Sequence, residues 1–427
     1  MRRTAAPSGA LLVHAHTSVP HPAIMSSAPH RLAPRAVGVL AAVVANLVAC
    51  RASPTQTPEN GAAQRSPQPE ASRGVVRAER VARGLVNPWA LAFLPDGRML
   101  VTEKPGRLRV VTTAGAVSPP ITGVPDVWAR GQGGLLDVAL DPQFATNRMV
   151  YLSFAEAGAD GTNGTAVARG RLNAAATALE GTQVIYRQTP KVQSSGHFGS
   201  RLVFGRDGRL WITQGDRQQD RWRTQAQDLG SGIGKIVRIA ADGSVPPDNP
   251  FATRAGARPE IWSYGHRNVQ AAALHPTTGE LWTVEHGPRG GDELNRPVAG
   301  RNHGWPVITY GVDYSGARIG EGTAKAGMEQ PLYYWDPVIA PSGATFVTGN
   351  RYPGWAGSLV VGGLATKVLV RLVLEGDAAN PRVAREERYL ADFGQRIRDV
   401  QQGPDGFLYV VTDDDDGQVA RVVPAGR

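Results

Sequence analysis

A turn carrying glycine or asparagine, followed by a short apolar run, recurs along this chain. The clearest copies are Leu94–Thr102, Phe204–Thr213, His275–Val284 and Gly403–Thr412. Two weaker copies are Asp141–Tyr151 and Pro353–Val361. The apolar runs are rich in residues that favour strands, and a turn of this composition between such runs is typical of a β-hairpin. The pattern therefore predicts six hairpins.

The spacing of these hairpins indicates a repeated unit. Their turn residues are Gly97, Asn147, Gly208, Gly279, Gly357 and Gly406. Successive turns are 50, 61, 71, 78 and 49 positions apart, near the blade period of about 40 to 50 residues with insertions in the middle blades. We expect an all-β fold, a six-bladed β-propeller with four-stranded antiparallel blades over residues 75–427. A β-sandwich or two smaller β domains is the alternative, although sandwiches show no such recurrence.

The N-terminus has the layout of an export signal. Residues 1–24 are interpreted as an upstream extension, with the true start at Met25. From there a basic stretch precedes an apolar run, residues 36–48, which is short for a membrane-spanning helix of about 20 residues. We therefore predict a signal peptide over residues 1–50. Leu47-Val-Ala-Cys50 resembles the lipobox of bacterial lipoproteins, so we expect a lipid anchor on Cys50 and a periplasmic or cell-envelope location; an ordinary signal peptide is the alternative.

The segment after Cys50 is predicted to be a disordered tether. Residues 51–74 are polar and proline-rich, a composition that cannot bury enough apolar surface to order itself. Removing residues 1–50 removes four arginines and no acids, so the formal charge falls from +9 to +5 (9 − 4). The remaining domain has no Lys/Arg blocks and offers no case for nucleic-acid binding. A modest positive charge suits an anionic ligand.

Two polar motifs suggest where such a ligand would lie. Arg267-Asn268 offers a guanidinium fork and an amide to an oxygen-rich anion. The Gly287-Pro288 step turns the chain and can expose carbonyls to a hard cation such as calcium. In a propeller, connections from several blades converge at one end of a central channel. The two motifs together predict an anionic cofactor resting on a metal.

Three further candidates are ambiguous taken singly. His197 has small residues on both sides, which leaves room for a ligand, and it is either a general base or a structural histidine. Gln132 stands among glycines and either binds a ligand or serves a turn. Arg396 and Arg398 alternate along a strand and so share one face, where they either bind two carboxylates or form a solvated edge.

Taken jointly, these segments resemble the soluble pyrroloquinoline-quinone (PQQ)-dependent sugar dehydrogenases, in particular the bacterial aldose sugar dehydrogenases. The resemblance runs from about Val81 to Val423, in unchanged order. Its markers are Asn87–Phe93, Gly131–Leu136, Gly196–Leu202, Tyr264–Asn268, Glu285–Pro288, Gly290–Asn295, Asn302–Pro306, Ala340–Gly343 and Arg396–Asp399. The family is a six-bladed propeller, in agreement with the hairpin count.

The resemblance implies a role for each candidate. His197 would take the proton from the sugar C1 hydroxyl while hydride moves to the quinone C5, and Arg267 would stabilise the charge developing on the quinone oxygen. The residues that would hold the cofactor are Gln132, Arg267, Asn268, Tyr314, Arg396 and Arg398. Those that would bind calcium are Gly287 and Pro288 at the cofactor, and Glu293 and His303 at a second position. An aldose would be the substrate, and a cytochrome, a quinone or another carrier would accept the electrons.

Three departures from the family pattern qualify this assignment. The family commonly has tyrosine at the position of His303, beside the second calcium. The glucose-specific members have a cofactor-binding lysine where this chain has Ala365, and an acid at the position of Gly196. These last two departures favour the broader-specificity aldose branch.

Two other classes of function are compatible with a propeller of this sequence. A calcium-dependent propeller lactonase would hold one central calcium with side-chain carboxylates and amides, whereas this chain offers a carbonyl bend and three arginines. A non-catalytic propeller that binds sugars or proteins is the second alternative, since a fold alone does not determine function. A red-shifted quinone absorption on adding PQQ and calcium would separate the dehydrogenase from both.

Overall fold

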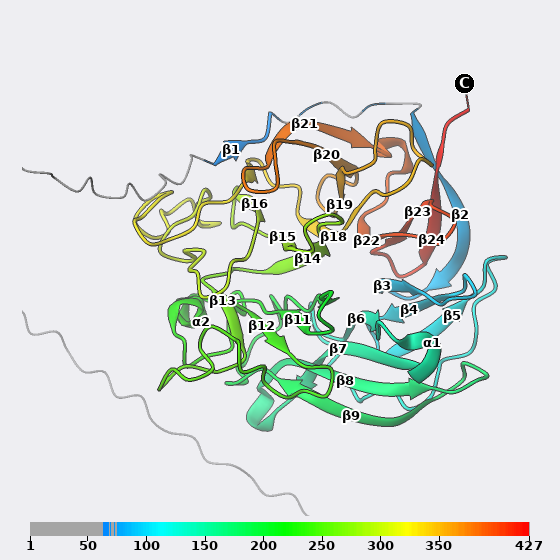
Figure 1. Ribbon diagram of the computed structural model, residues 1–427, viewed down its shortest axis with the longest axis horizontal. Coiled ribbons are helices and arrows are strands. Elements are labelled where there is room, and N and C mark those ends of the chain that lie inside the picture. The colour runs from blue at the N-terminus through cyan, green and yellow to red at the C-terminus, as the bar shows by residue number, and fades with distance from the viewer. Residues whose placement is uncertain (1–62, 68, 70–71, 73–74, 427) are drawn as a thin grey trace, which may run out of the picture. The chain divides into compact units, whose positions relative to one another are not determined.

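The computed structural model describes residues 63–67, 69, 72 and 75–426, all of which belong to one compact unit. Sheets surround a central axis in Figure 1, in the order in which they occur along the chain. The innermost strands of neighbouring sheets contact one another around the ring. This is the six-bladed β-propeller expected from the recurrence of hairpins.

The blades follow one another along the chain. The first three contain β3 (Pro88–Phe93), β4 (Met99–Glu103) and β5 (Arg107–Val111); β6 (Leu135–Leu140), β7 (Met149–Ala157), β8 (Asn163–Leu172) and β9 (Leu179–Arg187); and β10 (Leu202–Phe204), β11 (Leu210–Thr213), β12 (Lys235–Ile239) and β13 (Ile261–Tyr264). The last three contain β14 (Val269–Leu274), β15 (Leu281–Glu285), β16 (Asp292–Asn295) and β17 (Tyr333–Trp335); β18 (Pro341–Phe346), β19 (Leu359–Gly363), β20 (Leu369–Glu375) and β21 (Arg382–Tyr389); and β22 (Ile397–Gln402), β23 (Leu408–Thr412), β24 (Gly417–Pro424) and β2 (Val76–Leu85). In the first blade, residues 117–121 run beside β5 as an irregular fourth strand, with the amides of Ser118 and Ile121 bonded to β5 carbonyls.

The two inner strands of every blade form the predicted hairpins. The turn at Gly208 joins β10 to β11 with Leu202 opposite Ile212, and the other five predicted turns lie between the corresponding strand pairs. The ring is closed by hydrogen bonds between the two ends of the domain, because β2 pairs along β24 from Val76 opposite Pro424 to Leu85 opposite Gly417.

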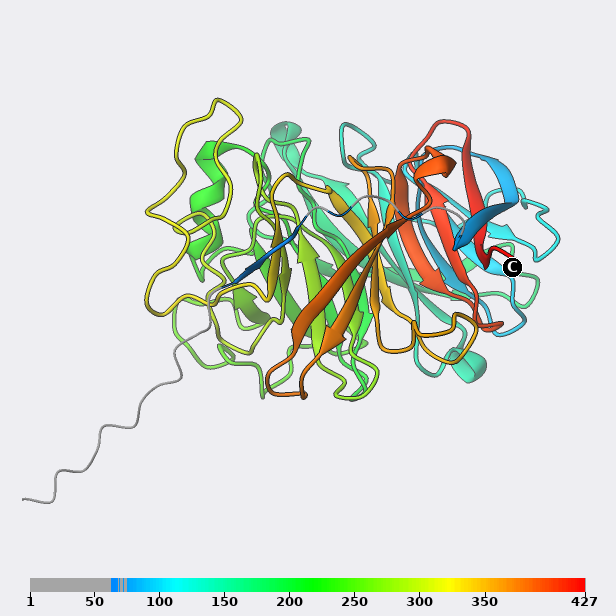
Figure 2. The same cartoon turned by 90° about the horizontal axis from the view of Figure 1, so that it is seen from above.

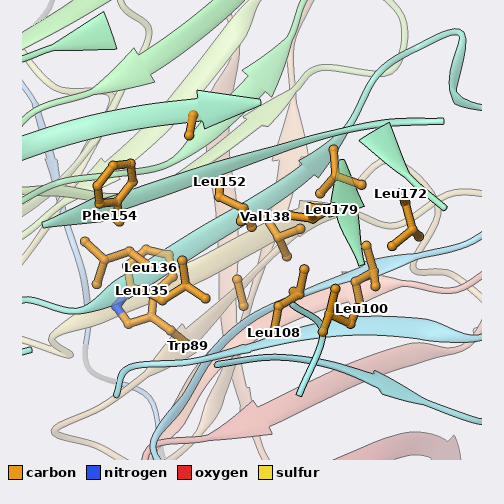
Figure 3. Close-up of a cluster of buried hydrophobic side chains, with 14 of the residues drawn as sticks. Trp89, Leu100, Leu108, Leu135, Leu136, Val138, Leu152, Phe154, Leu172 and Leu179 are labelled. Atoms are coloured by element: carbon orange, nitrogen blue, oxygen red, sulfur yellow. The ribbon is translucent and has the colours of Figure 1, made fainter. Parts of the chain in front are cut away.

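Hydrophobic clusters fill the spaces between neighbouring blades. One of them joins the first two blades through buried side chains that include Trp89, Leu100, Leu135 and Phe154 (Figure 3). Similar clusters lie between the other neighbouring blades. Strands such as β4 and β15 are therefore buried along their whole length, since each blade packs on a neighbour at both faces. Burial on both faces explains why the alternation of polar residues along these strands is weak.

Short helices occur only in connections within the described part of the chain. They are α1 (Phe144–Asn147), α2 (Asp220–Arg223), η1 (Ala159–Gly161), η2 (Thr224–Gln227) and η3 (Ala391–Phe393). None of the described helices is long and apolar enough to cross a membrane. The long connection between β16 and β17, yellow in Figure 2, extends well beyond the strands of its blade.

The prediction of a disordered tether over residues 51–74 is wrong for residues 63–67. Strand β1 (Gln64–Arg65) pairs in parallel with β17, opposite Tyr333 and Tyr334. Ser66 is buried, and its hydroxyl donates to Glu386 at 2.6 Å. An exposed blade edge and a buried carboxylate supply the partners that the polar composition could not reveal. The predicted signal peptide and Cys50 lie outside the described residues.

A buried ionic cluster closes the central channel. Arg201 lies 3.0 Å from Asp137 and 3.1 Å from Asp399 in the two ion pairs, and it also donates to the Gln270 carbonyl. Asp399 accepts from the amide of Leu91. Asp399 also lies so close to Gly343, in the fifth blade, that a Cβ there would be 1.9 Å from its Oδ1. The cluster therefore contacts inner strands or their ends in all six blades, and it separates two cavities at the opposite ends of the channel.

Candidate active site

One of the two channel cavities gathers the predicted cofactor and base residues. It has a volume of about 340 Å³. Its lining includes all seven of them, namely Gln132, His197, Arg267, Asn268, Tyr314, Arg396 and Arg398. Six of them lie in five different connections, and Arg398 lies at the start of β22; they are up to 266 positions apart in the sequence (398 − 132). The circular arrangement of the blades thus brings together side chains that the sequence identified only as separate candidates.

His197 stands at the rim of the cavity with only 4 % of its surface exposed. Its Nδ1 is 2.6 Å from Oδ1 of Asp216, and its backbone amide donates to Oε1 of Gln132 at 2.8 Å. Burial lowers the pKa of His197 below its ordinary value, and the cations of Arg267 and Arg217 lower it further against the opposing effect of Asp216. The imidazole is therefore neutral at pH 7.

Asp216 sets the orientation of that imidazole. Burial alone would raise the pKa of Asp216, but His197, Arg267 and the amide of Gln218 outweigh burial and hold the pKa below its usual value. Its second oxygen, Oδ2, accepts from Trp305 Nε1 at 2.8 Å. An ionised Asp216 accepts from Nδ1–H of His197, which leaves Nε2 with the lone pair that a base requires.

Arg267 is fixed from three sides. Its backbone amide donates to Glu285 at 2.6 Å, and its Nη1 donates to the carbonyls of His286 and Gly287 at 3.1 and 2.5 Å. Its guanidinium carbon lies 5.3 Å from the centre of the Trp305 ring. The indole ring of Trp305, which donates to Asp216, thus also packs against Arg267. Trp305 therefore couples the position of the candidate base to that of the candidate cation.

Three further cations line the cavity beside Arg267. Arg396 and Arg398 each place an Nη2 2.8 Å from the same Asp413 oxygen, and Arg398 also donates to Gln270. Burial would raise the pKa of Asp413, but Arg398 and Arg396 outweigh burial and lower it to about 2. Lys104 lines the same cavity. With neutral histidines the lining carries an excess of three positive charges (4 − 1), which suits a ligand with several carboxylates.

The Gly287-Pro288 bend is held tightly below Arg267. The Gly287 amide donates to Asp292 at 2.8 Å, and a Cβ on Gly287 would lie 2.2 Å from the Gly291 carbonyl carbon. Only glycine fits there. Burial raises the pKa of Asp292 to about 7, against the three backbone amides that it accepts. The Gly287 carbonyl already receives Arg267, whereas the Pro288 carbonyl accepts no hydrogen bond from the described residues.

Glu293 and His303 lie together at a separate, much smaller cavity behind this bend. Burial and the nearby Glu285 raise the pKa of Glu293 to about 8. Both ring nitrogens of His303 lack partners among the described residues, and the ring stacks on His266 at 4.5 Å. Among those residues, no group of three or more His, Cys, Asp or Glu side chains is arranged to hold a metal ion. A cation here would need backbone oxygens as well.

Several lining residues were missed by the sequence reasoning. They are Trp89, Lys104, Gln218, Gln270, His286, Ala340, Leu364 and Asp413, together with Asp216 and Trp305 behind them. The third hairpin gave a signal for Asp216. Leu202 lies opposite Ile212, so counting five residues away from the turn on each side places His197 opposite residue 217, next to Asp216. Lys104 and Asp413 carried no comparable signal, since they follow ordinary strands.

Comparison with known proteins gives concordant matches. Residues 85–421 match the protein family described as glucose / sorbosone dehydrogenase. The aldose sugar dehydrogenase YliI of Escherichia coli (strain K12) is 47 % identical over 357 residues, which cover 83 % of this chain and 94 % of that protein. The apo-form crystal structure of the soluble aldose sugar dehydrogenase from Escherichia coli has a TM-score of 0.78 at 46 % identity, covering 82 % of this chain and 99 % of that one. The PQQ-bound aldose sugar dehydrogenase from Streptomyces coelicolor has a TM-score of 0.68 at 30 % identity, covering 83 % and 99 %.

Proposed function

This chain belongs to the glucose / sorbosone dehydrogenase family, and from that premise we propose that it is a PQQ- and calcium-dependent aldose sugar dehydrogenase. The observation that carries the proposal is that the neutral, Asp216-oriented His197 lines the same cation-rich cavity as Arg267. A lactonase would need a carboxylate-rich calcium centre there, and the lining contains only one carboxylate, Asp413.

The chain's own residues support a base-assisted oxidation at the sugar C1. His197 Nε2 accepts the proton of the C1 hydroxyl, and Asp216 stabilises the resulting imidazolium, because a buried ionised carboxylate is already hydrogen-bonded to Nδ1. Arg267 offers a fixed cation to the oxygen on which negative charge develops. Loss of the hydroxyl proton and of a hydride from C1 converts the aldose into its lactone.

The residues of the cavity fit PQQ. When bound, the quinone supplies the hydride acceptor that no amino-acid side chain can provide. Its three carboxylates match the excess of three positive charges on the lining, where Arg396 and Arg398 would hold the carboxylates. Gln132, Asn268 and Tyr314 would contact its polar rim. Tyr314 is 65 % exposed on the connection between β16 and β17, so it would cover the ligand from the solvent side.

Calcium would bind at the Gly287-Pro288 bend. The Pro288 carbonyl, which accepts no hydrogen bond from the described residues, and the adjacent Gly287 carbonyl would be its ligands beside the cofactor. Calcium there would act as a Lewis acid on the bound quinone. We propose Glu293 and His303 as the second position, where His303 would contribute its main-chain oxygen.

A reconstitution assay tests the function. Protein treated with a chelator and freed of quinone is expected to be inactive towards a panel of aldoses with an artificial electron acceptor. Addition of PQQ together with calcium should restore activity, and either one alone should not. Full turnover in the chelator without added quinone would contradict the proposal. The same panel identifies the preferred sugar, and the natural carrier that reoxidises the enzyme is then sought among cytochromes and quinones.

We also propose that the enzyme is exported and anchored by lipid on Cys50. The motif Leu47–Cys50 supports this, and Cys50 is the only cysteine in the sequence. Each buried CH₂ of an acyl chain adds about 0.8 kcal/mol to membrane affinity. The full-length product should fractionate with membranes, and Cys50→Ser should block lipid attachment. An unmodified peptide spanning Ala49 to Ala52 in mass spectra of the mature protein would refute lipidation and leave the propeller chemistry untouched.

A further inference from the structure

Arg217 is a buried cation directly beneath the His197 segment. It has no solvent exposure, and it forms no ion pair with a carboxylate among the described residues. Burial lowers its pKa to about 9, which still leaves it charged at pH 7. A buried charge without a paired carboxylate is costly and is retained where surrounding dipoles compensate it.

The dipoles that compensate Arg217 belong to the segment that carries His197. Its Nη2 donates to the Ser194 carbonyl at 3.0 Å, and its Nη1 donates to the His197 carbonyl at 3.3 Å. The Ser194 hydroxyl returns a hydrogen bond to the Arg217 carbonyl at 2.6 Å. The guanidinium carbon lies 3.6 Å from the centre of the Phe198 ring. The guanidinium group of Arg217 therefore bonds to both ends of the turn from Ser194 to His197.

The backbone around this contact needs such support. His197 has a φ of 47°, Ser200 of 92°, Arg217 of 67° and Gln218 of 64°. Non-glycine residues adopt this left-handed region only when their surroundings hold them there. Without the Arg217 guanidinium, the backbone at His197 would relax to a negative φ, which would turn the imidazole away from Asp216. Among these residues, His197 is the one whose carbonyl the Arg217 guanidinium holds directly, together with the Ser194 carbonyl at the other end of the turn.

From these contacts we propose that Arg217 is a positioning residue for the dehydrogenase reaction, holding the strained His197 segment so that the imidazole faces both Asp216 and the cavity. The proposal rests on the proposed function, because it assumes that His197 is the base. Arg217 touches no cavity surface and would make no contact with the sugar or the cofactor.

The charge of Arg217 has a second consequence for the same imidazole. After burial and Arg267, it is a further cause of the lowered pKa of His197. The charged or titratable groups that face His197 are Asp216, Arg217, Arg267 and His286, and those farther around the cavity are Lys104, Arg396, Arg398 and Asp413. Neutralising Arg217 while the imidazole stays against Asp216 should therefore raise the pKa of His197.

Asn163 offers a way to neutralise Arg217 without removing it. Arg217 Nη2 donates to Asn163 Oδ1 at 2.5 Å, and Nδ2 of Asn163 has no partner among the described residues. Asn163→Asp therefore keeps the shape and the acceptor and loses no hydrogen bond. It adds a carboxylate against the guanidinium.

Three variants test the proposal, with Arg371→Met as the matched control. Arg371 is a buried arginine of the fifth blade, 4.9 Å from the Trp355 ring and remote from the cavity. Arg217→Met should lower kcat by about 10- to 100-fold with little change in KM, because a small misplacement of a catalytic group costs up to about 10²-fold. Arg217→Lys should lower kcat, because one ammonium group cannot span both carbonyls. It should leave the acid limb of the pH profile in place, because the positive charge is kept. Asn163→Asp should move that limb to higher pH. Arg371→Met should alter only the melting temperature.

A readout independent of turnover is the ¹⁵N NMR titration of His197 in the full chain without cofactor. Its pKa should rise in Asn163→Asp, where the imidazole stays against Asp216, and stay unchanged in Arg371→Met. Wild-type kcat in Arg217→Lys, or an unshifted His197 titration in Asn163→Asp, would overturn the proposal, and these two variants decide it if Arg217→Met does not fold. Absence of sugar oxidation by the wild type would instead refute the proposed function, while the NMR titration would still test the contact between Arg217 and the His197 segment.

Discussion

The two ends of the central channel differ in chemistry far more than in size. The cavity with His197 has about 340 Å³, and the one at the opposite end has about 460 Å³. The larger one is lined mainly by the ends of the inner strands, with side chains such as Phe93, Leu140, Phe204, Leu274 and Phe346. Its charged residues, Asp137 and Arg201, are paired with each other at its floor. The volume of a cavity therefore does not identify the candidate active site, whereas an excess of unpaired charge on its lining does.

The difference follows from how each end is built. The opposite end is formed by the hairpin turns and by the ends of the inner strands that lead into them. The His197 end is formed where the inner strands begin. There Asn87, His197 and Ala340 have positive φ although none is glycine. Strained backbone of this kind collects at functional sites, where the surrounding structure can hold it.

Replacing the candidate base should produce the largest change. His197→Gln keeps size and polarity but cannot take the proton, so kcat should fall by about 10²- to 10⁴-fold while PQQ binding persists. Stopped-flow assays and a PQQ titration measure the two quantities. Thr345→Val, at the opposite end of the channel, is the control and should keep wild-type kcat. Unchanged activity in His197→Gln, or loss of the fold, would make His197 a structural histidine.

Arg201 separates the two ends, and its removal should destabilise both. Arg201→Met leaves Asp137 and Asp399 buried without their partner, which typically costs about 3 to 5 kcal/mol of unfolding free energy. Denaturant unfolding measures this loss. The double variant Arg201→Met/Asp137→Asn removes one of the stranded charges and should recover part of it. Equal stability of the single and double variants would mean that Asp137 is already uncharged once Arg201 is gone, because burial raises its pKa even in the presence of Arg201.

Loss of an arginine from the cationic lining should weaken the cofactor selectively. Arg398→Met removes a charged hydrogen-bond donor, worth about 1.5 to 3 kcal/mol, so PQQ affinity should fall by about 10- to 100-fold. Equilibrium titration of the cofactor-free protein measures the change. In the same titration, Thr345→Val should bind like the wild type. An unaltered Kd for Arg398→Met would place the cofactor carboxylates elsewhere.

The pH profile should carry the signature of the His197 end. Because the pKa of His197 lies below its usual 6.5, the neutral base persists as pH falls, and kcat/KM should decline only below about pH 6.5. The sign follows from protonation: activity is present above the folded pKa and lost below it. A decline centred above that value would contradict the burial of this imidazole.

The smallest effect is expected at the opposite end. Phe204→Leu removes part of an apolar lining residue that packs edge-on against Tyr151, so stability should fall by about 1 kcal/mol while kcat and KM change by less than about twofold. Thermal unfolding and steady-state kinetics measure both. A large kinetic effect would show that the two ends communicate through the Arg201 cluster.

Local sequence patterns predicted much of the fold and part of the site. The six hairpins, the ring and the order of the polar motifs depend on turn chemistry and strand composition, which are local properties, and all six hairpins are present. His197, Arg267, Arg396 and Arg398 stood in distinctive motifs, and the structure brings them to one cavity. Residues 63–67 escaped prediction because their order depends on a distant blade edge and on Glu386.

The sequence by itself determined the repeat, the closure into a propeller and the set of polar motifs available to a site, because each depends on neighbouring residues and on the count of hairpins. Only the tertiary structure decided that Trp305 would hold Asp216, that Asp216 would orient His197, and that Arg217 would support it from below. It also decided which end of the channel would carry unmatched charge. These choices join segments from different blades, and contacts between blades depend on the closed ring rather than on any local pattern.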